Sequence, residues 1–102
     1  MYIAMNRFSV NEGRETGFEE MWLKRERFLD EVEGFLDFKL LRGETDDGAT
    51  PYISHSTWTS KDAFVAWTKG EAFQKAHRDA RSPEGTLAGH PQFGGFDVIA
   101  TA

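Results

Sequence analysis

The first thirty residues change from an alternating pattern of side chains to a helical one. Over residues 2–10 every second position falls on the same side of an extended chain, as in a β-strand with two different faces. The two sides are Ala4, Asn6, Phe8 and Val10, and Ile3, Met5, Arg7 and Ser9. From residue 18 the apolar positions recur at helical spacing, at Phe18, Met21, Trp22, Leu23, Phe28, Leu29 and Val32. The pattern predicts a strand and then a helix, with Gly34 as its left-handed C-terminal cap.

A β-hairpin is predicted next. Residues 35–42 read as a strand in which Phe35 is expected to face away from Leu36, Phe38 and Leu40. The stretch "GETDDGATP" at 43–51 contains an Asp-Gly pair, which is typical of a tight hairpin turn. Residues 52–59 are rich in β-formers and are predicted to be the second strand of this hairpin.

The last part of the chain predicts a broken helix, a long loop and a final strand. Ser60 is a suitable N-cap for a helix over residues 61–70, which is expected to break or kink at Gly70 and to resume from Glu71 to about Asp79. The segment 82–95 is expected to be a loop, because it holds four of the ten glycines and two of the three prolines. Residues 96–101 are predicted to form the last strand.

The order β-α-β-β-α-β is that of an α+β, ferredoxin-like domain, here a single domain over residues 1–102. Such a domain has a four-stranded antiparallel sheet with its helices on one face, so the other face is bare. Ile3, Met5, Phe35 and Tyr52 are expected to contribute apolar surface there. A bare apolar face favours a sheet-to-sheet homodimer, a dimeric α+β barrel, over a monomer with a solvated sheet.

Composition narrows the classes of function. The net charge is −5, from 17 acidic and 12 basic residues, so the chain has no electrostatic footprint for nucleic acid or an anionic membrane surface. No apolar run approaches the roughly 20 residues of a membrane span, and the N-terminus is too short and polar for a signal peptide, so a cytoplasmic protein is expected. There is no cysteine, and the three histidines lie far apart in the sequence. A nucleophile triad and a zinc helix are therefore poorly supported, whereas a site with a single histidine, such as one for haem, stays open. A phosphate loop is not expected either, because no glycine-rich loop leads from a strand into a helix.

Three residues are candidates for such a site. His77 shares a helix face with Phe73, and Trp67 shares one with Phe64, so both faces would line an aromatic pocket if they turn inward. Taken alone, His77 is more simply a partly buried helix histidine, and Trp67 a core residue. Asn6 favours a ligand site over these simpler interpretations. An asparagine side chain buried on an apolar strand face costs free energy unless it makes a hydrogen bond with a neighbouring residue or with a ligand.

At these residues the chain resembles the IsdG/HmuQ type of haem-degrading monooxygenases, within the wider antibiotic-biosynthesis-monooxygenase group. The resemblance is carried by "SKDAFVAWTKGEAFQKAHRDARS" (60–82), "MNRFSVNEG" (5–13), "EGFLDFKLL" (33–41) and "STWTSK" (56–61). It covers nearly the whole chain and is weakest over 43–50 and 82–95. It implies a dimeric ferredoxin-like fold and an enzyme that opens the haem ring to a linear tetrapyrrole and releases iron for haem iron acquisition. Haem would be both substrate and oxygen-activating centre, with O2 and an external reductase or small reductant.

The resemblance also implies roles for individual residues. His77 is the expected axial ligand of the haem iron, Asn6 the distal hydrogen-bond donor, and Trp67 the side chain that presses on the macrocycle and buckles it. Trp22 is expected either to line the pocket or simply to pack in the core. Arg25 is a candidate partner for a haem propionate. The cluster of Lys75, Arg78 and Arg81 reads more simply as a solvated helix face, and His55 and His90 are given no role.

Other functions stay open from the sequence. The same pocket without an iron ligand would suit a cofactor-independent monooxygenase that acts on a phenolic or quinol substrate. A pocket that binds haem without oxygen chemistry would make the protein a haem-binding module, and a dimeric scaffold would bind no ligand at all.

Overall fold

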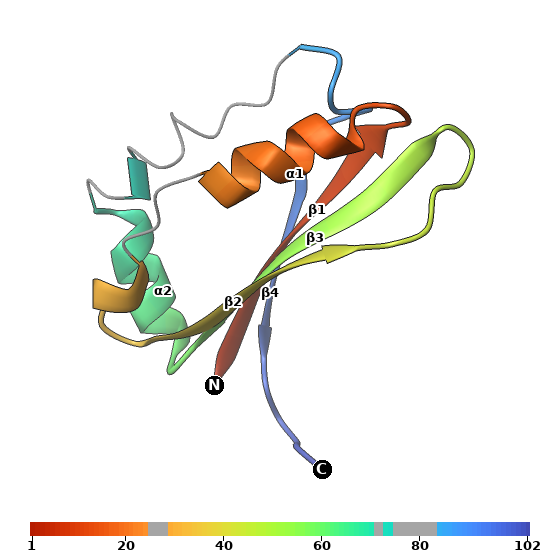
Figure 1. The fold of residues 1–102 in the computed structure, drawn as a ribbon. Helices are drawn as coiled ribbons and strands as arrows, with labels where there is room; N and C mark the ends of the chain where they lie inside the picture. The colour runs from red at the N-terminus through yellow and green to blue at the C-terminus, as the bar shows by residue number, and fades with distance from the viewer. Residues whose placement is uncertain (25–28, 71–72, 75–83) are drawn as a thin grey trace.

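A computed structural model shows the fold and describes residues 1–24, 29–70, 73–74 and 84–102. The elements, in chain order, are β1 (Tyr2–Asn11), α1 (Glu15–Lys24), the 3₁₀ turn η1 (Leu29–Glu31), β2 (Phe35–Arg42), β3 (Ala49–Trp58), α2 (Lys61–Thr68) and β4 (Gln92–Asp97). The four strands form one antiparallel sheet in the order β2-β3-β1-β4, and α1 and α2 both cover the same face (Figure 1). The α+β ferredoxin-like fold is confirmed.

The alternation in β1 is confirmed. Tyr2, Ala4 and Val10 are buried on the side of the helices, which also carries Asn6 and Phe8. β1 is a central strand, since it pairs with β3 along its whole length and with β4 on its other side. The residues of β1 that face the helices therefore lie in the middle of the covered face.

The hairpin between β2 and β3 closes through the predicted Asp-Gly turn. Asp47 and Gly48 both have positive φ angles, of 51° and 78°, and Asp46 and Ala49 exchange two backbone hydrogen bonds. These features define a type I′ turn, whose twist matches that of the paired strands. Because the turn is so short, β3 begins at Ala49 and not at residue 52 as predicted.

The predicted facing of Phe35 and Tyr52 is wrong. A register shift between Phe35 and Asp37 marks a β-bulge, which turns Phe35 to the same side as Phe38 and Leu40. Phe35 packs edge-on against Trp58 in the core. Tyr52 is buried and packs on Phe18 of α1, so it also faces the helices. The open face of the sheet carries Ile3, Met5, Leu41, Ile53 and Phe96 as its apolar residues.

The first helix is shorter than its apolar repeat predicted. α1 is described over Glu15–Lys24, and residues 29–31 form a 3₁₀ turn where the apolar repeat predicted α-helix up to Val32. Leu23, counted in the apolar repeat, is 76% exposed. Gly34 has the predicted positive φ of 85°, but it serves the turn into β2, where its carbonyl oxygen accepts a hydrogen bond from the backbone N–H of Thr59.

The predicted position of the last strand is also wrong. β4 spans Gln92–Asp97, so residues 92–95 belong to the sheet and not to the loop. Gly95 lies under the phenol of Tyr2, where an added Cβ would come within 1.8 Å of the hydroxyl oxygen. A glycine that reads as a loop residue is here required by the close approach of a side chain from the neighbouring strand.

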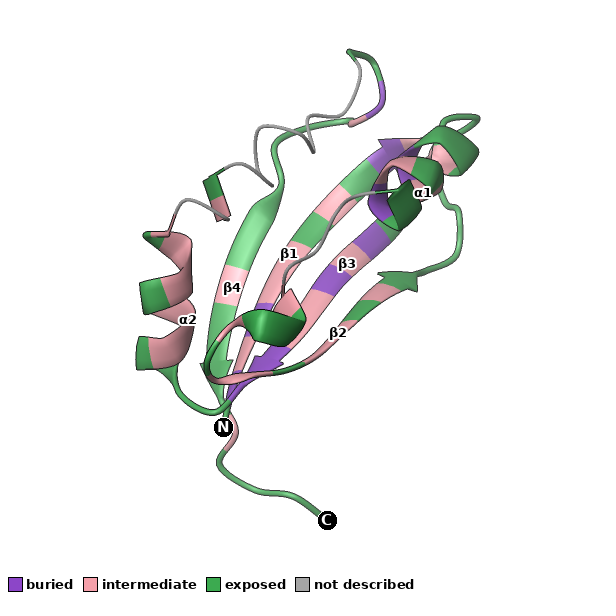
Figure 2. Cartoon of the chain, turned by 60° about the vertical axis from the view of Figure 1, so that its left-hand side comes forward, coloured by how far each residue is buried: buried purple, intermediate pink, exposed green. Residues whose placement is uncertain are grey.

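The core consists of two aromatic clusters on the helix-covered face. One lies under α1 and contains Val10, Phe18, Trp22 and Tyr52, and the other lies under α2 and contains Tyr2, Ala4 and Trp58. In Figure 2 the buried positions gather on β1, β3 and α1, while β4 is exposed along most of its length. In the described part of the chain, no helix is long and apolar enough to cross a membrane.

Candidate functional site

Small and polar side chains separate the two aromatic clusters. Across the sheet, Asn6 pairs with Ser54 of β3 on one side and with Phe93 of β4 on the other. In the next row toward the α2 cluster, Ala4 lies between Ser56 and Gly95. The row of Asn6 thus places an amide and a hydroxyl next to each other in the middle of the covered face, with the Phe93 ring on the β4 side.

Asn6 lies in this strip with an unused amide. The residue keeps intermediate exposure although it is on the helix-covered face, so a ligand can reach it. The described residues include no hydrogen-bond partner for its side chain. By contrast, the Ser56 hydroxyl one row away donates to the carbonyl oxygen of Ala4 (3.3 Å) and accepts from Trp58 Nε1 (3.0 Å). Asn6 therefore does not serve the fold in the way that Ser56 does.

α2 places Trp67 beside the same strip. The helix begins at the predicted N-cap, where the Ser60 side chain accepts a hydrogen bond from the backbone N–H of Ala63 at 3.1 Å. Phe64 and Trp67 both point inward and pack on Trp58, at centroid distances of 5.6 and 5.2 Å. Trp67 is thus partly a core residue, as its simpler interpretation predicted.

The helical break at Gly70 brings Phe73 back to Trp67. α2 ends at Thr68, and a further helical turn is marked by the hydrogen bond from the Gln74 N–H to the Gly70 carbonyl oxygen (3.3 Å). Phe73 meets the Trp67 indole edge-on at 4.7 Å. The two sides of the break at Gly70 therefore share one aromatic contact.

Phe64 extends the aromatic surface to the edge of the sheet. It stacks on Phe93 with the rings nearly parallel, at 8° and 5.7 Å. Phe93 lies opposite Asn6 in the β1–β4 ladder and remains 55% exposed. The amide of Asn6 is consequently flanked by exposed aromatic surface, which suits a flat apolar ligand.

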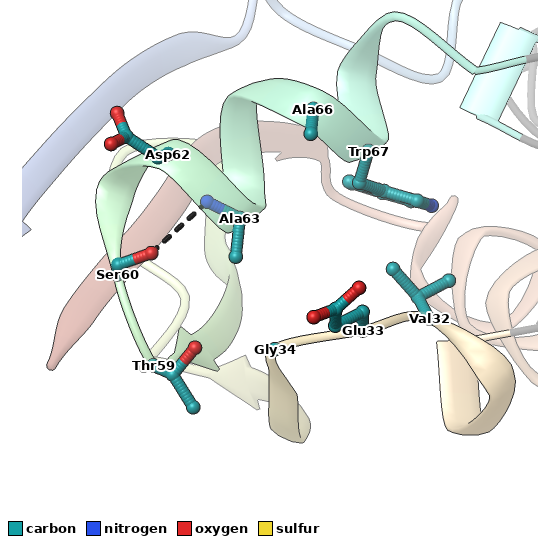
Figure 3. Close-up of a pocket in the computed structure, with 9 residues that line it drawn as sticks. All are labelled: Val32, Glu33, Gly34, Thr59, Ser60, Asp62, Ala63, Ala66 and Trp67. Atoms are coloured by element: carbon teal, nitrogen blue, oxygen red, sulfur yellow. Dashed lines mark hydrogen bonds between the residues drawn. The ribbon is translucent and has the colours of Figure 1, made fainter.

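A separate groove lies on the other side of Trp67, between α2 and the turn into β2 (Figure 3). It has a volume of about 680 Å³, and the Trp67 indole reaches from α2 toward Val32 across it. Nine residues line the groove: Val32, Glu33, Gly34, Thr59, Ser60, Asp62, Ala63, Ala66 and Trp67. Its charged residues are two acids, Glu33 and Asp62, so it would repel a carboxylate of a ligand.

Trp22, Arg25 and His77 are the other predicted site residues. Trp22 is buried, stacks on Phe38 at 5.6 Å and meets Phe8 edge-on, so it belongs to the α1 cluster. Arg25 and His77 lie outside the described residues. Among the described residues no three His, Cys, Asp or Glu side chains gather in a way that could hold a metal ion.

In the described part of the chain, most titratable groups with shifted pKa values lie away from Asn6, where α1 meets the sheet, and one more, Asp37, lies on the open face of the sheet. The Tyr52 hydroxyl donates to Glu19 Oε2, which also accepts from Arg42 Nη1 at 2.9 Å. The hydrogen bond from Tyr52, together with Arg42, lowers the pKa of Glu19. Burial and the adjacent Glu19 carboxylate raise the pKa of Tyr52 to about 12. This network fastens α1 to the sheet and offers no general acid or base to a ligand at Asn6.

Sequence reasoning missed Ser54 and Phe93 as neighbours of Asn6. Both are identified only by strand register, because each is the cross-strand partner of Asn6. The short Asp-Gly turn signals the register of β2 against β3, but no local pattern aligns β1 with β3. Phe93 also lies in the segment 82–95, which the sequence predicts to be a loop.

The chain is similar to a known protein family and to named proteins. The family model described as antibiotic biosynthesis monooxygenase matches residues 1–79. A protein named heme-degrading monooxygenase from Halalkalibacterium halodurans is 29% identical over 99 residues, which cover 97% of this chain and 84% of that relative.

Two solved structures share the fold over nearly the whole chain. The heme degrader MhuD from Mycobacterium tuberculosis, solved with two hemes bound in its active site, has a TM-score of 0.76 at 24% identity, with 100% of this chain and 99% of that chain covered. SnoaB, a cofactor-independent oxygenase from Streptomyces nogalater, has a TM-score of 0.73 at 24% identity, with 98% and 94% covered. Since the family model spans most of the sequence, the chain belongs to the antibiotic biosynthesis monooxygenase family.

Proposed function

We propose that this protein is a haem-degrading monooxygenase, which uses O2 and a reductant to open the haem ring and release iron. The observation that carries the proposal is the unbonded amide of Asn6, held in the middle of the covered sheet face among aromatic side chains. Relatives named for haem degradation support the same substrate, at 29% identity for the protein from Halalkalibacterium halodurans.

The described residues fit a flat macrocycle. Phe64, Phe93 and Trp67 offer ring faces and edges, and Phe93 lies in the same row as the polar side chains of Asn6 and Ser54. Haem supplies the iron that activates oxygen and is itself the molecule that is opened. The protein then needs few acid–base groups, which agrees with the lack of such groups around Asn6 in the described part of the chain.

Each site residue has a distinct task in this proposal. His77 would hold the iron from one side, and the Asn6 amide would donate a hydrogen bond to the oxygen substrate on the other. A preorganised donor of this kind stabilises charge as it develops on the oxygen. Trp67, held in place by Trp58 and Phe73, would press on the macrocycle. Arg25 would pair with a propionate, and Trp22 would support the pocket from the α1 cluster.

A homodimer forms through the open face of the sheet in this proposal. That face carries apolar side chains with substantial exposure, among them Leu41 at 41% and Phe96 at 54%. It also carries two buried polar atoms, His55 Nδ1 and Asp37 Oδ1, which have no hydrogen-bond partner among the described residues. A second copy would cover the apolar surface and offer partners to the polar atoms.

Haem titration tests the proposal against its alternatives. Ferric haem added to the purified protein should give a shifted Soret band at one equivalent or a small integral number of equivalents, and the band should disappear when reductant and air are supplied. A haem complex that stays intact under reductant and air would indicate a haem-binding module instead. Oxygenation of a phenol or anthrone by haem-free protein would indicate a cofactor-independent monooxygenase, the class to which SnoaB belongs.

A further inference from the structure

Ser54 is a buried polar residue beside Asn6 that the fold does not use. It stands directly opposite Asn6 in the β1–β3 ladder, on the same covered face, and is 7% exposed. No described residue makes a hydrogen bond with its hydroxyl. The hydroxyl oxygen itself is not one of the fully enclosed side-chain atoms that lack a partner, so a ligand that lies on this face of the sheet can reach it.

Ser56 shows what a structural serine looks like on the same strand face. Its hydroxyl is engaged by both Ala4 and Trp58. Ser54 lies one row away, in the row of Asn6, and has no such contact with a described residue. Directly opposed residues in an antiparallel pair have Cβ atoms about 5 Å apart, so an amide and a hydroxyl in this arrangement can serve the same ligand atom.

We propose that Ser54 is a second hydrogen-bonding residue of the site, which acts on the bound oxygen substrate together with Asn6. The inference rests on the proposed haem-degrading function. A serine hydroxyl both accepts and donates, so it can accept an N–H of the Asn6 amide while it donates its own proton to the ligand oxygen. Two donors aimed at one oxygen would hold it at a fixed orientation over the macrocycle and stabilise its developing charge.

Three variants test this assignment, with ferrous haem and carbon monoxide as the spectroscopic probe. Ser54→Ala removes the hydroxyl, Ser54→Thr keeps it, and Ser56→Ala removes a hydroxyl of the same strand face that has structural partners. The C–O stretching frequency of the carbon monoxide complex reports on polar donors at the distal position and is read without turnover. The rate of Soret loss with reductant and air is measured in parallel.

The expected results separate a role in the site from a role in the fold. Ser54→Ala should shift the C–O stretch to higher frequency and slow haem degradation about tenfold, the effect of one lost hydrogen bond to a reacting atom. Ser54→Thr should restore both values toward those of the wild type. Ser56→Ala should lower the urea midpoint while leaving the C–O stretch unchanged.

Two outcomes would overturn the inference in distinguishable ways. If the wild type binds haem and degrades it, but Ser54→Ala has the wild-type C–O stretch and rate, the assignment of Ser54 is wrong and the proposed function stands. If the wild type binds no haem, the proposed function fails, and with it the ligand to which Ser54 was assigned.

Discussion

The indole of Trp67 lies 5.2 Å from that of Trp58, tilted by 33°, so a residue of α2 rests directly on the central strand β3. The same indole meets Phe73 edge-on, beyond the break at Gly70, and forms one wall of the groove in Figure 3. Trp67 thus packs in the core, contacts Phe73 beyond the break, and is also a predicted site residue. A role in packing and a role toward a ligand are combined in one side chain.

Substitutions of Trp67 should separate these roles. Trp67→Ala should lower the free energy of unfolding by about 2–4 kcal/mol, because a large aromatic side chain is removed from a partly buried position. Trp67→Phe should cost about 1–2 kcal/mol and leave the fold intact, while a smaller ring presses less on haem. Urea unfolding at a fixed protein concentration measures the first effect and the rate of Soret loss the second. Equal haem degradation by wild type and Trp67→Phe would show that Trp67 only packs.

Two glycines with positive φ should respond very differently to alanine. Gly48 has a φ of 78° and nothing within 4 Å of an added Cβ. Gly48→Ala should therefore lower the free energy of unfolding only by the penalty for an alanine in the left-handed region, about 1–2 kcal/mol. Gly34 has a similar φ of 85°, but its Cβ would lie 2.4 Å from the Cβ of Ala63. Gly34→Ala should therefore cost a further ~1–3 kcal/mol, because α2 must move away. Similar urea midpoints for the two variants would contradict the close packing of α2 on this turn.

The Glu19–Tyr52 hydrogen bond should make stability depend on pH at both ends of the scale. The pKa of Glu19 is lowered in the folded chain, chiefly by Tyr52, so this stabilisation is present above the unfolded carboxyl's pKa and is lost as the pH falls through the folded pKa. The pKa of Tyr52 is raised from 10.0 to about 12, so its contribution is present below pH 10 and is lost as the pH rises toward 12.

Tyr52→Phe checks this linkage. The variant should be less stable by about 1 kcal/mol near pH 7, and its stability should change less between pH 5 and 3 and between pH 10 and 12. Urea unfolding across the pH range gives the comparison, with Glu20→Gln as the control on the same helix. Parallel pH profiles for wild type and Tyr52→Phe would mean that the hydrogen bond does not stabilise the fold.

A charge on the open sheet face should break the proposed homodimer. Ile53 lies on β3 between Arg7 and Leu41, in the middle of that face. Ile53→Lys would place an ammonium group against the partner's apolar surface and should weaken association by at least about 100-fold. Light scattering after gel filtration measures the mass. Leu23→Lys alters an exposed leucine on α1, in the other layer, and should leave the dimer intact; a monomeric wild type would refute the proposed interface.

Much of the fold could be predicted from local patterns. Alternation in β1, the Asp47–Gly48 turn and the Ser60 cap each depend on a few adjacent residues, and all three are confirmed. The errors arose where distant residues decide the outcome. The bulge after Phe35 reverses its facing. Gly95 lies within a strand, where the Tyr2 phenol from the neighbouring strand leaves no room for a Cβ.

The candidate site was predictable only in part. Asn6 could be singled out, because an amide on an apolar strand face is unusual, whereas Trp67 alone indicated a core residue and became a candidate through the family resemblance. Ser54 could not, since a serine on a strand carries no signal until β1 and β3 are aligned. The contribution of His77, which lies outside the described residues, stays a prediction.

Aerobic turnover of the haem complex, with the tetrapyrrole identified by mass and absorption, tests the central claim most directly. Wild type and Asn6→Ala are each loaded with ferric haem and supplied with a reductant, with catalase present to remove free peroxide. The wild type should convert haem to a linear tetrapyrrole and release iron to a chelator. Asn6→Ala should bind haem with similar affinity and degrade it about tenfold more slowly, since it lacks one hydrogen bond to the oxygen substrate. Intact haem in the wild type, or equal rates in the two proteins, would contradict the account.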